Sequence, residues 1–274
     1  MSRLLRETRP ILLIKFYDEV ETARTCLLDS RYDLWELNGG KVDPRKIIRR
    51  LSHYLAVPER VLEANSNPNS VAFYDRLYEG RFEINNVSLE YQYEGPERKR
   101  WYKMVAQQPF FNCSGRLLDV GCGMAGLLNT LPKNTSLQLY GIDFSKVAVK
   151  TAKGRVDGSF MIGDVHCLPY GRESFDRIVL TETLEHVEHP ETVVREIHRA
   201  LKPSGKLLIT VPEKSLDLKP EEWPGGVDLH INKFSKETLR ELIGSNGFWV
   251  ESCEVVEREL WLIASKAMQP KPGR

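Results

Sequence analysis

Cysteine is scarce in this chain, with five residues among 274, and no two of them have the spacing of a metal-binding or redox pair. An odd number of scattered cysteines argues against a disulfide framework and against a cysteine zinc site. No apolar run approaches the roughly 18 residues of a membrane-spanning helix. The apolar stretch at residues 11–14 is too short for the core of a signal peptide. We therefore expect a protein of the reducing cytoplasm with no membrane span.

Neither sign of charge is in excess, since the formal net charge is +1. A balanced chain gives no global electrostatic support for a nucleic-acid or membrane-surface partner. The two local basic runs, at residues 45–50 and 97–103, are short enough to be ordinary solvated faces. The hydrophobic share of 41% is sufficient for a packed core. A small-molecule partner is expected, and nucleic acid is not.

Residues 112–266 alternate strand-like and helix-like segments, which predicts an α/β domain with a Rossmann-like, mostly parallel sheet. The seven expected strands are Arg116–Val120, Leu137–Asp143, Phe160–Gly163, Phe175–Thr181, Lys206–Val211, Phe248–Val256 and Glu259–Ala264. The expected helices are Met124–Leu131, Ser145–Lys153 ending at Gly154, a helix beginning at Pro190, and Ser235–Ser245. A turn is expected at Pro203–Gly205. The last two strands have no helix between them, so they predict a C-terminal hairpin with one antiparallel strand.

The first 111 residues have weaker patterns and predict a small α/β or helical appendage over residues 1–64, followed by a linker and helical lid over 65–111. The expected elements are strands at 11–17 and 32–37, and helices at 20–28, Pro44–Leu55, Pro58–Ala64, 71–78 and 97–107. The clearest linker signal is NSNPNS at residues 65–70. Residues 267–274 form an expected flexible tail. The appendage would serve recognition or dimerisation, or would be a remnant, so a homodimer is one expectation.

The glycine-rich stretch Leu117–Leu128 reads LLDVGCGMAGLL. Gly121, Gly123 and Gly126 satisfy the G-x-G-x-x-G pattern, which taken alone is a weak indication of dinucleotide binding. Asp119 argues against that reading, because a fixed carboxylate at this turn would repel a pyrophosphate. S-adenosylmethionine has no phosphate and carries an ammonium group that a carboxylate would favour. The glycines would let the backbone approach such a ligand closely.

Two further carboxylates end the next two expected strands. Asp143 lies 24 residues after Asp119 and can accept hydrogen bonds from both ribose hydroxyls. Asp164 follows the third strand and is placed to reach an adenine amino group. The predicted cofactor-binding set is Asp119, Gly121, Cys122, Gly123, Asp143, Phe144, Asp164, Val165 and Thr181.

Five motifs, DVGCG, GID, GDV, FDRI and LKPSGKL, occur in this order within residues 112–266. Together they resemble the class I S-adenosylmethionine-dependent methyltransferases, of the type 11/12 domain. The resemblance implies a methyl donor in the glycine loop and a methyl acceptor beside it. Ala125 departs from the pattern, since that family usually has a third glycine there. Alanine is small, so we expect cofactor binding to be retained; a non-catalytic binding module is the alternative.

Thr181–Pro190 (TETLEHVEHP) follows the fourth strand, at the edge where parallel sheets bind ligands. Glu182, Glu185 and His186 are spaced so that one helical turn would project them to one side. Such a group could bind Mg²⁺ or Mn²⁺. Alternatively, His186 is a general base that Glu182 or Glu185 orients, or the group is structural.

The E-x-x-E-H pattern resembles the metal motif of ubiquinone-pathway O-methyltransferases, and small-RNA 2′-O-methyltransferases have a similar motif. Both families add a histidine after the fifth strand, and His230 stands in the matching place. The resemblance implies Glu182, Glu185, His186 and His230 as metal ligands, and methylation of a small-molecule hydroxyl. N-methylation of an amine or amino sugar and RNA 2′-O-methylation are the alternatives.

Two expectations concern the remaining segments. Pro10–Val42 resembles part of the FkbM-type methyltransferases, which implies a glycan or natural-product setting. His166, His189 and His198 have no evident sequence partners and are expected at the surface.

Overall fold

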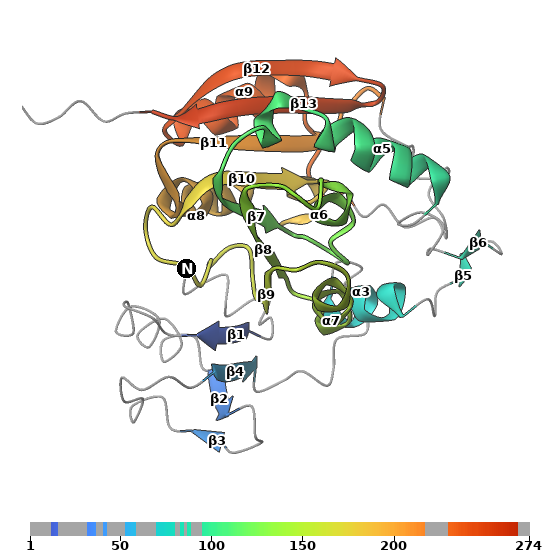
Figure 1. Ribbon diagram of the computed structural model, residues 1–274, viewed down its shortest axis with the longest axis vertical. Helices are drawn as coiled ribbons and strands as arrows, with labels where there is room; N and C mark the ends of the chain where they lie inside the picture. The colour runs from blue at the N-terminus through green and yellow to red at the C-terminus, as the bar shows by residue number, and fades with distance from the viewer. Residues whose placement is uncertain are drawn as a thin grey trace, which may run out of the picture.

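The computed structural model describes residues 12–15, 32–36, 41–42, 53–58, 70–79, 83–84, 87–88, 95–216 and 230–267. Its main feature is a seven-stranded sheet in the order β12-β13-β11-β10-β7-β8-β9 (Figure 1). The strands are β7 (Gly115–Val120), β8 (Leu137–Asp143), β9 (Ser159–Ile162), β10 (Phe175–Thr181), β11 (Leu201–Pro212), β12 (Phe248–Val256) and β13 (Glu259–Lys266). β13 runs antiparallel to both of its neighbours, and the β7, β8, β9, β10 and β11 pairings are parallel. This confirms the expected Rossmann-like sheet and its C-terminal hairpin.

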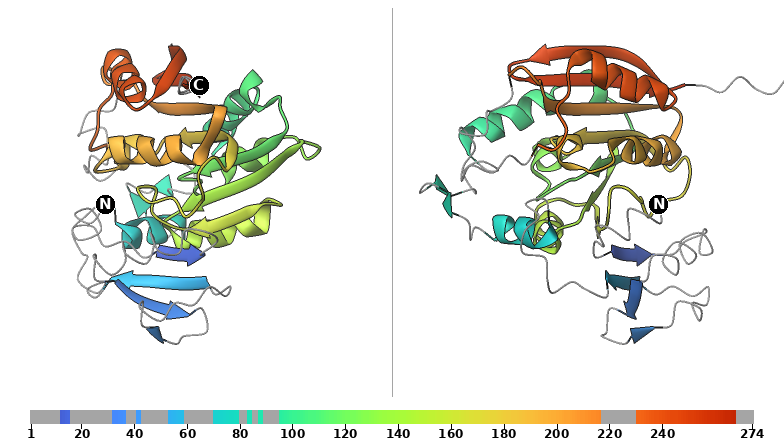
Figure 2. Two further views of the ribbon diagram at one scale, coloured as in Figure 1. Left: turned by 90° about the vertical axis from the view of Figure 1, so that its left-hand side faces the viewer. Right: turned by 180° about the vertical axis from the view of Figure 1, so that it is seen from behind.

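Helices cover both faces of this sheet, with α5 and α6 on one face and α8 and α9 on the other (Figures 1 and 2). Their bounds are α5 (Pro96–Ala106), α6 (Gly126–Thr130), α7 (Lys146–Arg155), α8 (Pro190–Ala200) and α9 (Lys236–Ser245). Alternate strand residues face the two layers. Leu117 and Leu208 pack in one core with α5, α6 and α7, whereas Leu118 and Ile209 pack in the other with α8 and α9. Burial on both faces explains why β7 and β10 are nearly continuous apolar runs.

Several expected boundaries need correction. The helix expected at Met124–Leu131 begins only at Gly126, because Ala125 adopts a left-handed conformation with φ of 60°. α7 continues through Gly154 to Arg155, because this glycine keeps a helical backbone and does not end the helix. The turn expected at Pro203–Gly205 lies within β11, where Ser204 has a φ of 61° and the strand register shifts.

Before the main domain, four strands form an antiparallel sheet in the order β1-β4-β2-β3. They are β1 (Leu12–Lys15), β2 (Tyr32–Glu36), β3 (Lys41–Val42) and β4 (His53–Pro58). The helices expected at Pro44–Leu55 and Pro58–Ala64 are therefore wrong where β4 runs. β4 pairs with β1 and β2 on its two sides, and this long-range pairing outweighs local helical preference. The helix expected at 20–28 lies outside the described residues, so the FkbM-like order remains a prediction.

Two of the helices expected before the sheet are confirmed, and their role as a lid stays a prediction. α3 (Val71–Tyr78) matches its expected bounds, and α5 shifts by one residue from 97–107. A short hairpin, β5 (Glu83–Ile84) with β6 (Val87–Ser88), lies between them in the sequence. None of the described helices has the length and apolarity to cross a bilayer.

Candidate active site

The glycine loop connects β7 to α6 at the carboxyl edge of the sheet. Gly121 and Gly123 both have positive φ, at 76° and 50°. The Gly121 and Cys122 amides donate to the carbonyl of Ile142 at 2.8 and 3.0 Å, which ties the loop to β8. A Cβ at Gly121 would lie 2.3 Å from Thr183 Oγ1, so glycine is required where the loop meets the segment after β10.

The departure at Ala125 is accommodated by the backbone. Ala125 is fully buried and left-handed, and the next residue, Gly126, opens α6. A Cβ at Gly126 would lie 2.3 Å from the ring of Tyr102 on α5. The close contact that needs glycine is therefore at 126, and position 125 tolerates a methyl group.

Asp119 occupies the end of β7 and is 2% exposed. Its Oδ1 is buried and accepts no hydrogen bond from the described residues. Burial, and then the charge of Asp143, raise the pKa of Asp119 to about 8. A cationic group beside Asp119 would relieve both effects, whereas a phosphate would worsen them. This chemistry fits the ammonium group of S-adenosylmethionine.

Asp143 ends β8 and is held by the loops on both sides. Its Oδ2 accepts from the Gly123 amide and its Oδ1 from the Ser145 amide, each at 2.9 Å. Burial raises the pKa of Asp143 to about 6, and these backbone hydrogen bonds oppose the rise. Each oxygen keeps a further lone pair, so the carboxylate can still accept from a ribose.

Asp164 is held by His166, a residue that the sequence had led us to expect at the surface. Asp164 Oδ1 accepts from the backbone amide of His166 at 2.9 Å and lies 2.7 Å from His166 Nδ1. His166 is buried, so its expected surface position is wrong. His189 and His198 are half-buried, and His198 packs edge-on against Phe248. The cause is tertiary packing around the loop after β9 and around α8.

The side chains of the remaining predicted cofactor-binding residues are buried to different extents. The Cys122 side chain is buried in the core beside Leu127, so only its backbone belongs to the loop surface. Val165 packs partly against the other core. Phe144 and Thr181 are half-buried at the ends of β8 and β10.

Helix α3 covers the part of the site formed by the glycine loop and the residues that follow β8. The Tyr74 ring lies 5.1 Å from that of Phe144, and the Tyr78 hydroxyl lies beside Gly123. Asp75 Oδ1 accepts from Ser145 Oγ at 2.6 Å, which fastens α3 to the start of α7. Tyr74 also lies edge-on to His186, with ring centroids 6.3 Å apart. Helix α3 therefore contacts both the glycine loop and the segment after β10, and the only sequence signal for it was the aromatic content of residues 73–78.

The segment after β10 is not the regular helical turn that its spacing suggested. Leu184–His186 forms a short 3₁₀ turn, and Glu182 precedes it with a φ of 49°. The Glu182 amide donates to the Thr210 carbonyl at 3.0 Å, and its Oε1 accepts from Thr210 Oγ1 at 3.2 Å. The left-handed backbone and these two bonds turn Glu182 toward β11.

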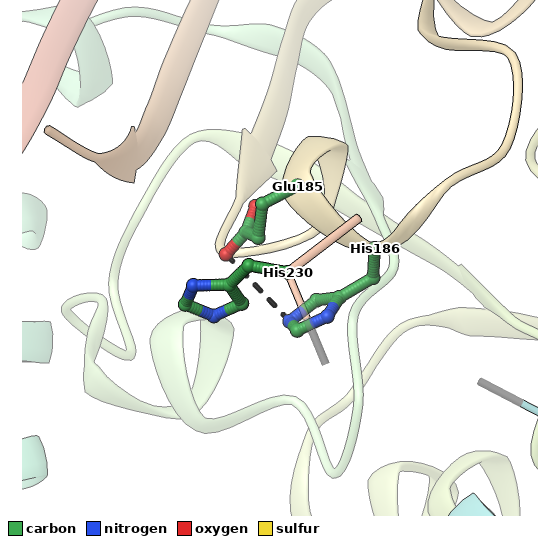
Figure 3. Close-up of side chains that lie close together, drawn as sticks. All are labelled: Glu185, His186 and His230. Carbon is green, nitrogen blue, oxygen red and sulfur yellow. Dashed lines mark ion pairs between the residues drawn. The ribbon is translucent and has the colours of Figure 1, made fainter. Parts of the chain in front are cut away.

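Three of the four predicted ligands do come together. One ligand atom each from Glu185, His186 and His230 lie within 4.8 Å of one another, and Figure 3 shows the three side chains converging. Glu182 is not in this group, which corrects the expected set of four. Glu185 Oε1 lies 3.7 Å from His186 Nε2, and the two imidazole rings are 4.9 Å apart.

Asn232 fixes the position of His230, and sequence reasoning gave no signal for it. Its backbone amide donates to the Glu185 carbonyl at 3.0 Å. Its side-chain amide donates to the carbonyls of Leu184 and Val187 at 3.2 and 2.5 Å. These bonds clasp the segment before α9 onto the 3₁₀ turn, so His230 faces His186.

Glu185 is the most constrained group of this cluster. It is 1% exposed, and neither carboxylate oxygen accepts a hydrogen bond from the described residues. Burial, followed by the charge of Glu182, raises its pKa well above the ordinary value. Such a group favours a proton or a bound cation at its carboxylate.

A separate cavity of about 360 Å³ lies between α5 and the β11, β13 and β12 strands, with Met104, Trp261 and Ile263 in its lining. It contains none of Asp119, Glu185, His186 and His230. The carboxyl edge of the sheet is therefore the candidate site.

Comparison with known proteins agrees with this geometry. Residues 118–209 match the family model described as a methyltransferase domain. Residues 118–209 are therefore similar to methyltransferase domains, and the strand order of the sheet is Rossmann-like.

Two curated relatives show how far the similarity extends. Norajmaline N-methyltransferase of Rauvolfia serpentina is 33% identical over 119 residues, which are 39% of this chain and 41% of the relative. A 37.1 kDa protein in a Streptomyces fradiae transposon is 28% identical over 211 residues, 74% of this chain and 55% of that protein. A match of that coverage reaches beyond the methyltransferase domain into residues before 112. The chain spans about half or less of the length of these relatives.

Among solved structures, a chain from the Trm112 methyltransferase activator complex of Haloferax volcanii superposes with a TM-score of 0.57 at 19% identity. The match covers 66% of this chain and 96% of that one. At this identity the likeness shows the fold alone, and the chemistry must be argued from the site.

Proposed function

We propose that this protein transfers the methyl group of S-adenosylmethionine to a hydroxyl of a small molecule. The observation that supports this most directly is the Glu185–His186–His230 cluster, since Tyr74 lies against both His186 and Phe144, and Thr183 of the same segment meets Gly121 of the glycine loop. A group that can accept a proton thus lies next to the predicted donor site. The resemblance to ubiquinone-pathway O-methyltransferases, now carried by three residues, favours a hydroxyl acceptor.

The cofactor half has the donor set that S-adenosylmethionine needs. Asp119 would bind the ammonium group, Asp143 the ribose hydroxyls and Asp164 the adenine amino group, with Gly121 and Gly123 allowing close approach. S-adenosylmethionine, when bound, supplies an electrophilic methyl group on a sulfonium. The protein therefore has mainly to orient the acceptor and exclude water, for which α3 is positioned.

On the acceptor side, His186 would take the proton of the attacking hydroxyl. The acceptor oxygen then forms its bond to the methyl carbon as the carbon–sulfur bond breaks, and the neutral thioether leaves. Glu185, 3.7 Å from His186 Nε2, would orient the imidazole and stabilise its protonated form. His230 would border the acceptor from the opposite side.

A divalent metal is the second route for activating the acceptor. Glu185, His186 and His230 supply one oxygen and two nitrogen ligand atoms, a set that divalent transition metals accept. A metal held there would lower the pKa of a bound hydroxyl. Glu182 would contribute only through its charge.

N-methylation is a second candidate function. The unsatisfied Glu185 carboxylate favours an acceptor that arrives with a proton or a positive charge, and two similar proteins are named as N-methyltransferases. In that case Glu185 or His186 would remove the ammonium proton before attack.

The test uses the full chain with S-adenosylmethionine labelled in its methyl group. Small phenols, sugars, amines and a short RNA duplex serve as acceptors, with and without EDTA. We expect label on small hydroxyl compounds. Label on amines only, or on RNA only, would replace the proposal with the corresponding alternative. Cofactor binding in calorimetry without label on any acceptor would support a binding module, and activity unchanged by EDTA in a metal-free preparation would eliminate the metal route.

A further inference from the structure

Glu259 is a carboxylate at the same edge of the sheet that the proposed reaction does not use. It is the first residue of β13 and pairs with Pro212 at the end of β11. Trp101 Nε1 and Trp261 Nε1 both donate to its Oε2, at 2.6 and 3.1 Å. The two indoles come from α5 and β13 and are each 8% exposed. Both indoles thus hold Oε2 of Glu259, and neither of these two hydrogen bonds uses Oε1.

The strand register brings Glu259 and its tryptophans to the acceptor side. Trp261 pairs with Thr210, and Thr210 pairs with Thr181 on the neighbouring strand. Thr210 in turn donates to Glu182. The charge of Glu259 acts on Glu185, although weakly compared with burial and with Glu182. Glu182 and Glu185 from one chain segment and Glu259 from another therefore lie on the acceptor side of this edge.

The opposing positive charge is small. The Arg98 guanidinium lies 4.8 Å from the ring centre of Trp101, and its charge acts on both Glu185 and Glu259. Arg100 is paired with Glu257 at the hairpin tip, and that glutamate adds negative charge near Glu259. Among the described residues, His186 and His230 also lie beside Glu185. Four glutamates in this part of the chain face two arginines, one of which is paired with Glu257, so carboxylates are in excess.

This environment discriminates between classes of acceptor. An anionic acceptor would be disfavoured beside these carboxylates, and a neutral one would bring no positive charge to the buried Glu185 oxygens. An ammonium group could donate to Glu185 or to Glu259, whose Oε2 is held in place by the Trp101 and Trp261 indoles.

We propose that Glu259, held by the Trp101 and Trp261 indoles, and the buried Glu185 form an ammonium-binding subsite, so that the methyl acceptor carries a basic amine. The inference rests on the proposed function, because it assumes that the acceptor binds at this edge. It adds a substrate class: amino alcohols, aminophenols or amino sugars rather than neutral or acidic hydroxyl compounds.

The experiment titrates three phenols that differ only in side-chain charge into the full chain saturated with S-adenosylhomocysteine. They are tyramine, 4-ethylphenol and 3-(4-hydroxyphenyl)propionate. We expect tyramine to bind roughly tenfold more tightly than 4-ethylphenol, and the propionate more weakly than both. Glu259→Gln should bring the ratio of tyramine affinity to 4-ethylphenol affinity close to one. Glu257→Gln, an exposed neighbour on the same hairpin, is the matched control and should keep the preference.

The outcomes separate the two claims. If the chain binds neither S-adenosylmethionine nor S-adenosylhomocysteine, the proposed function fails. If the cofactor binds but tyramine has no advantage, or the advantage survives in Glu259→Gln, the ammonium subsite is refuted and the proposed function stands. If Glu259→Gln lowers only the affinity for S-adenosylmethionine, the carboxylates bind the sulfonium and not the acceptor. That result would also overturn the inference.

Discussion

The carboxyl edge of the sheet has two parts whose carboxylates differ in their hydrogen bonding. We call the part that holds Asp119, Asp143 and Asp164 the cofactor half, and the part that holds the Glu185 cluster the acceptor half. In the cofactor half, both oxygens of Asp143 accept backbone amides, and Asp164 is held by His166. In the acceptor half, Glu185 is equally buried but accepts no hydrogen bond from the described residues. The cofactor half is therefore largely preorganised, whereas the acceptor half is left to be completed by what binds there.

Asp119 differs from the other two carboxylates of the cofactor half. It lies in the cofactor half, yet one of its oxygens is unsatisfied, and it is the carboxylate assigned to a charged part of the ligand. Unsatisfied carboxylates thus occur in both halves where a cation or a proton is expected. Four predictions test this contrast.

The largest effect is expected at His186. His186→Gln removes the proton acceptor but keeps a polar side chain of similar length, so kcat should fall by about 100-fold or more. Affinity for S-adenosylhomocysteine should not change, because the cofactor half is separately organised. Rates measured on the best acceptor of the labelled screen, with calorimetry for the product, test both statements. His198→Gln on α8 is the control, and equal rates in the two variants would show that His186 has no part in proton transfer.

The next effect concerns cofactor affinity. Asp119→Asn removes the charge that would face the ammonium group, and we expect S-adenosylmethionine affinity to fall roughly 10- to 100-fold. The free energy of unfolding should not decrease, since the variant also removes a buried carboxylate with a pKa raised to about 8. Asp157→Asn, at an exposed position, should leave both quantities unchanged. Unchanged affinity in Asp119→Asn would remove the basis for the cofactor assignment.

The same carboxylate makes a pH-dependent contribution to stability. Its pKa is about 8 in the folded protein against an ordinary value of 3.8, so the folded state holds a proton that the unfolded state has lost. Without cofactor, the free energy of unfolding should fall as pH rises between these values, by at least about 1 kcal/mol between pH 6 and 8. Asp119→Asn should flatten this decline, and denaturant unfolding across that range measures it. A stability that rises with pH only in the wild type would contradict the assignment.

The smallest effect is expected at Ala125. Ala125→Gly relieves a left-handed alanine, worth roughly 1–2 kcal/mol. It also removes a buried methyl group, which costs about 0.8 kcal/mol of stability. The greater flexibility of glycine in the unfolded chain costs roughly 0.4–1 kcal/mol more. The net change in the free energy of unfolding should be below about 1 kcal/mol, with cofactor affinity within about threefold of the wild type. A large gain in affinity would show that alanine impairs the loop.

The sequence predicted closely the strands that carry the expected cofactor carboxylates, because strand signals are local. Strands such as Leu137–Asp143 and Phe175–Thr181 have the expected bounds, and the three carboxylates each lie within two residues of the end of a strand. The acceptor half was predicted less well. Helical spacing suggested that Glu182 would join Glu185 and His186, but its left-handed backbone and its bonds to Thr210 direct it elsewhere.

The order of apolar runs and turn residues by itself determined the seven-stranded sheet and its hairpin, because those properties depend on periodicity along the chain. It also determined the edge at which we expect ligands to bind. Only the tertiary structure decided which side chains share a site. His230 meets His186 through the clasp of Asn232, Tyr74 arrives from a helix more than a hundred residues earlier in the chain, and Glu259 is anchored by a tryptophan from α5. These contacts join segments far apart in the sequence, and their energies depend on burial and hydrogen-bond geometry that local patterns do not encode.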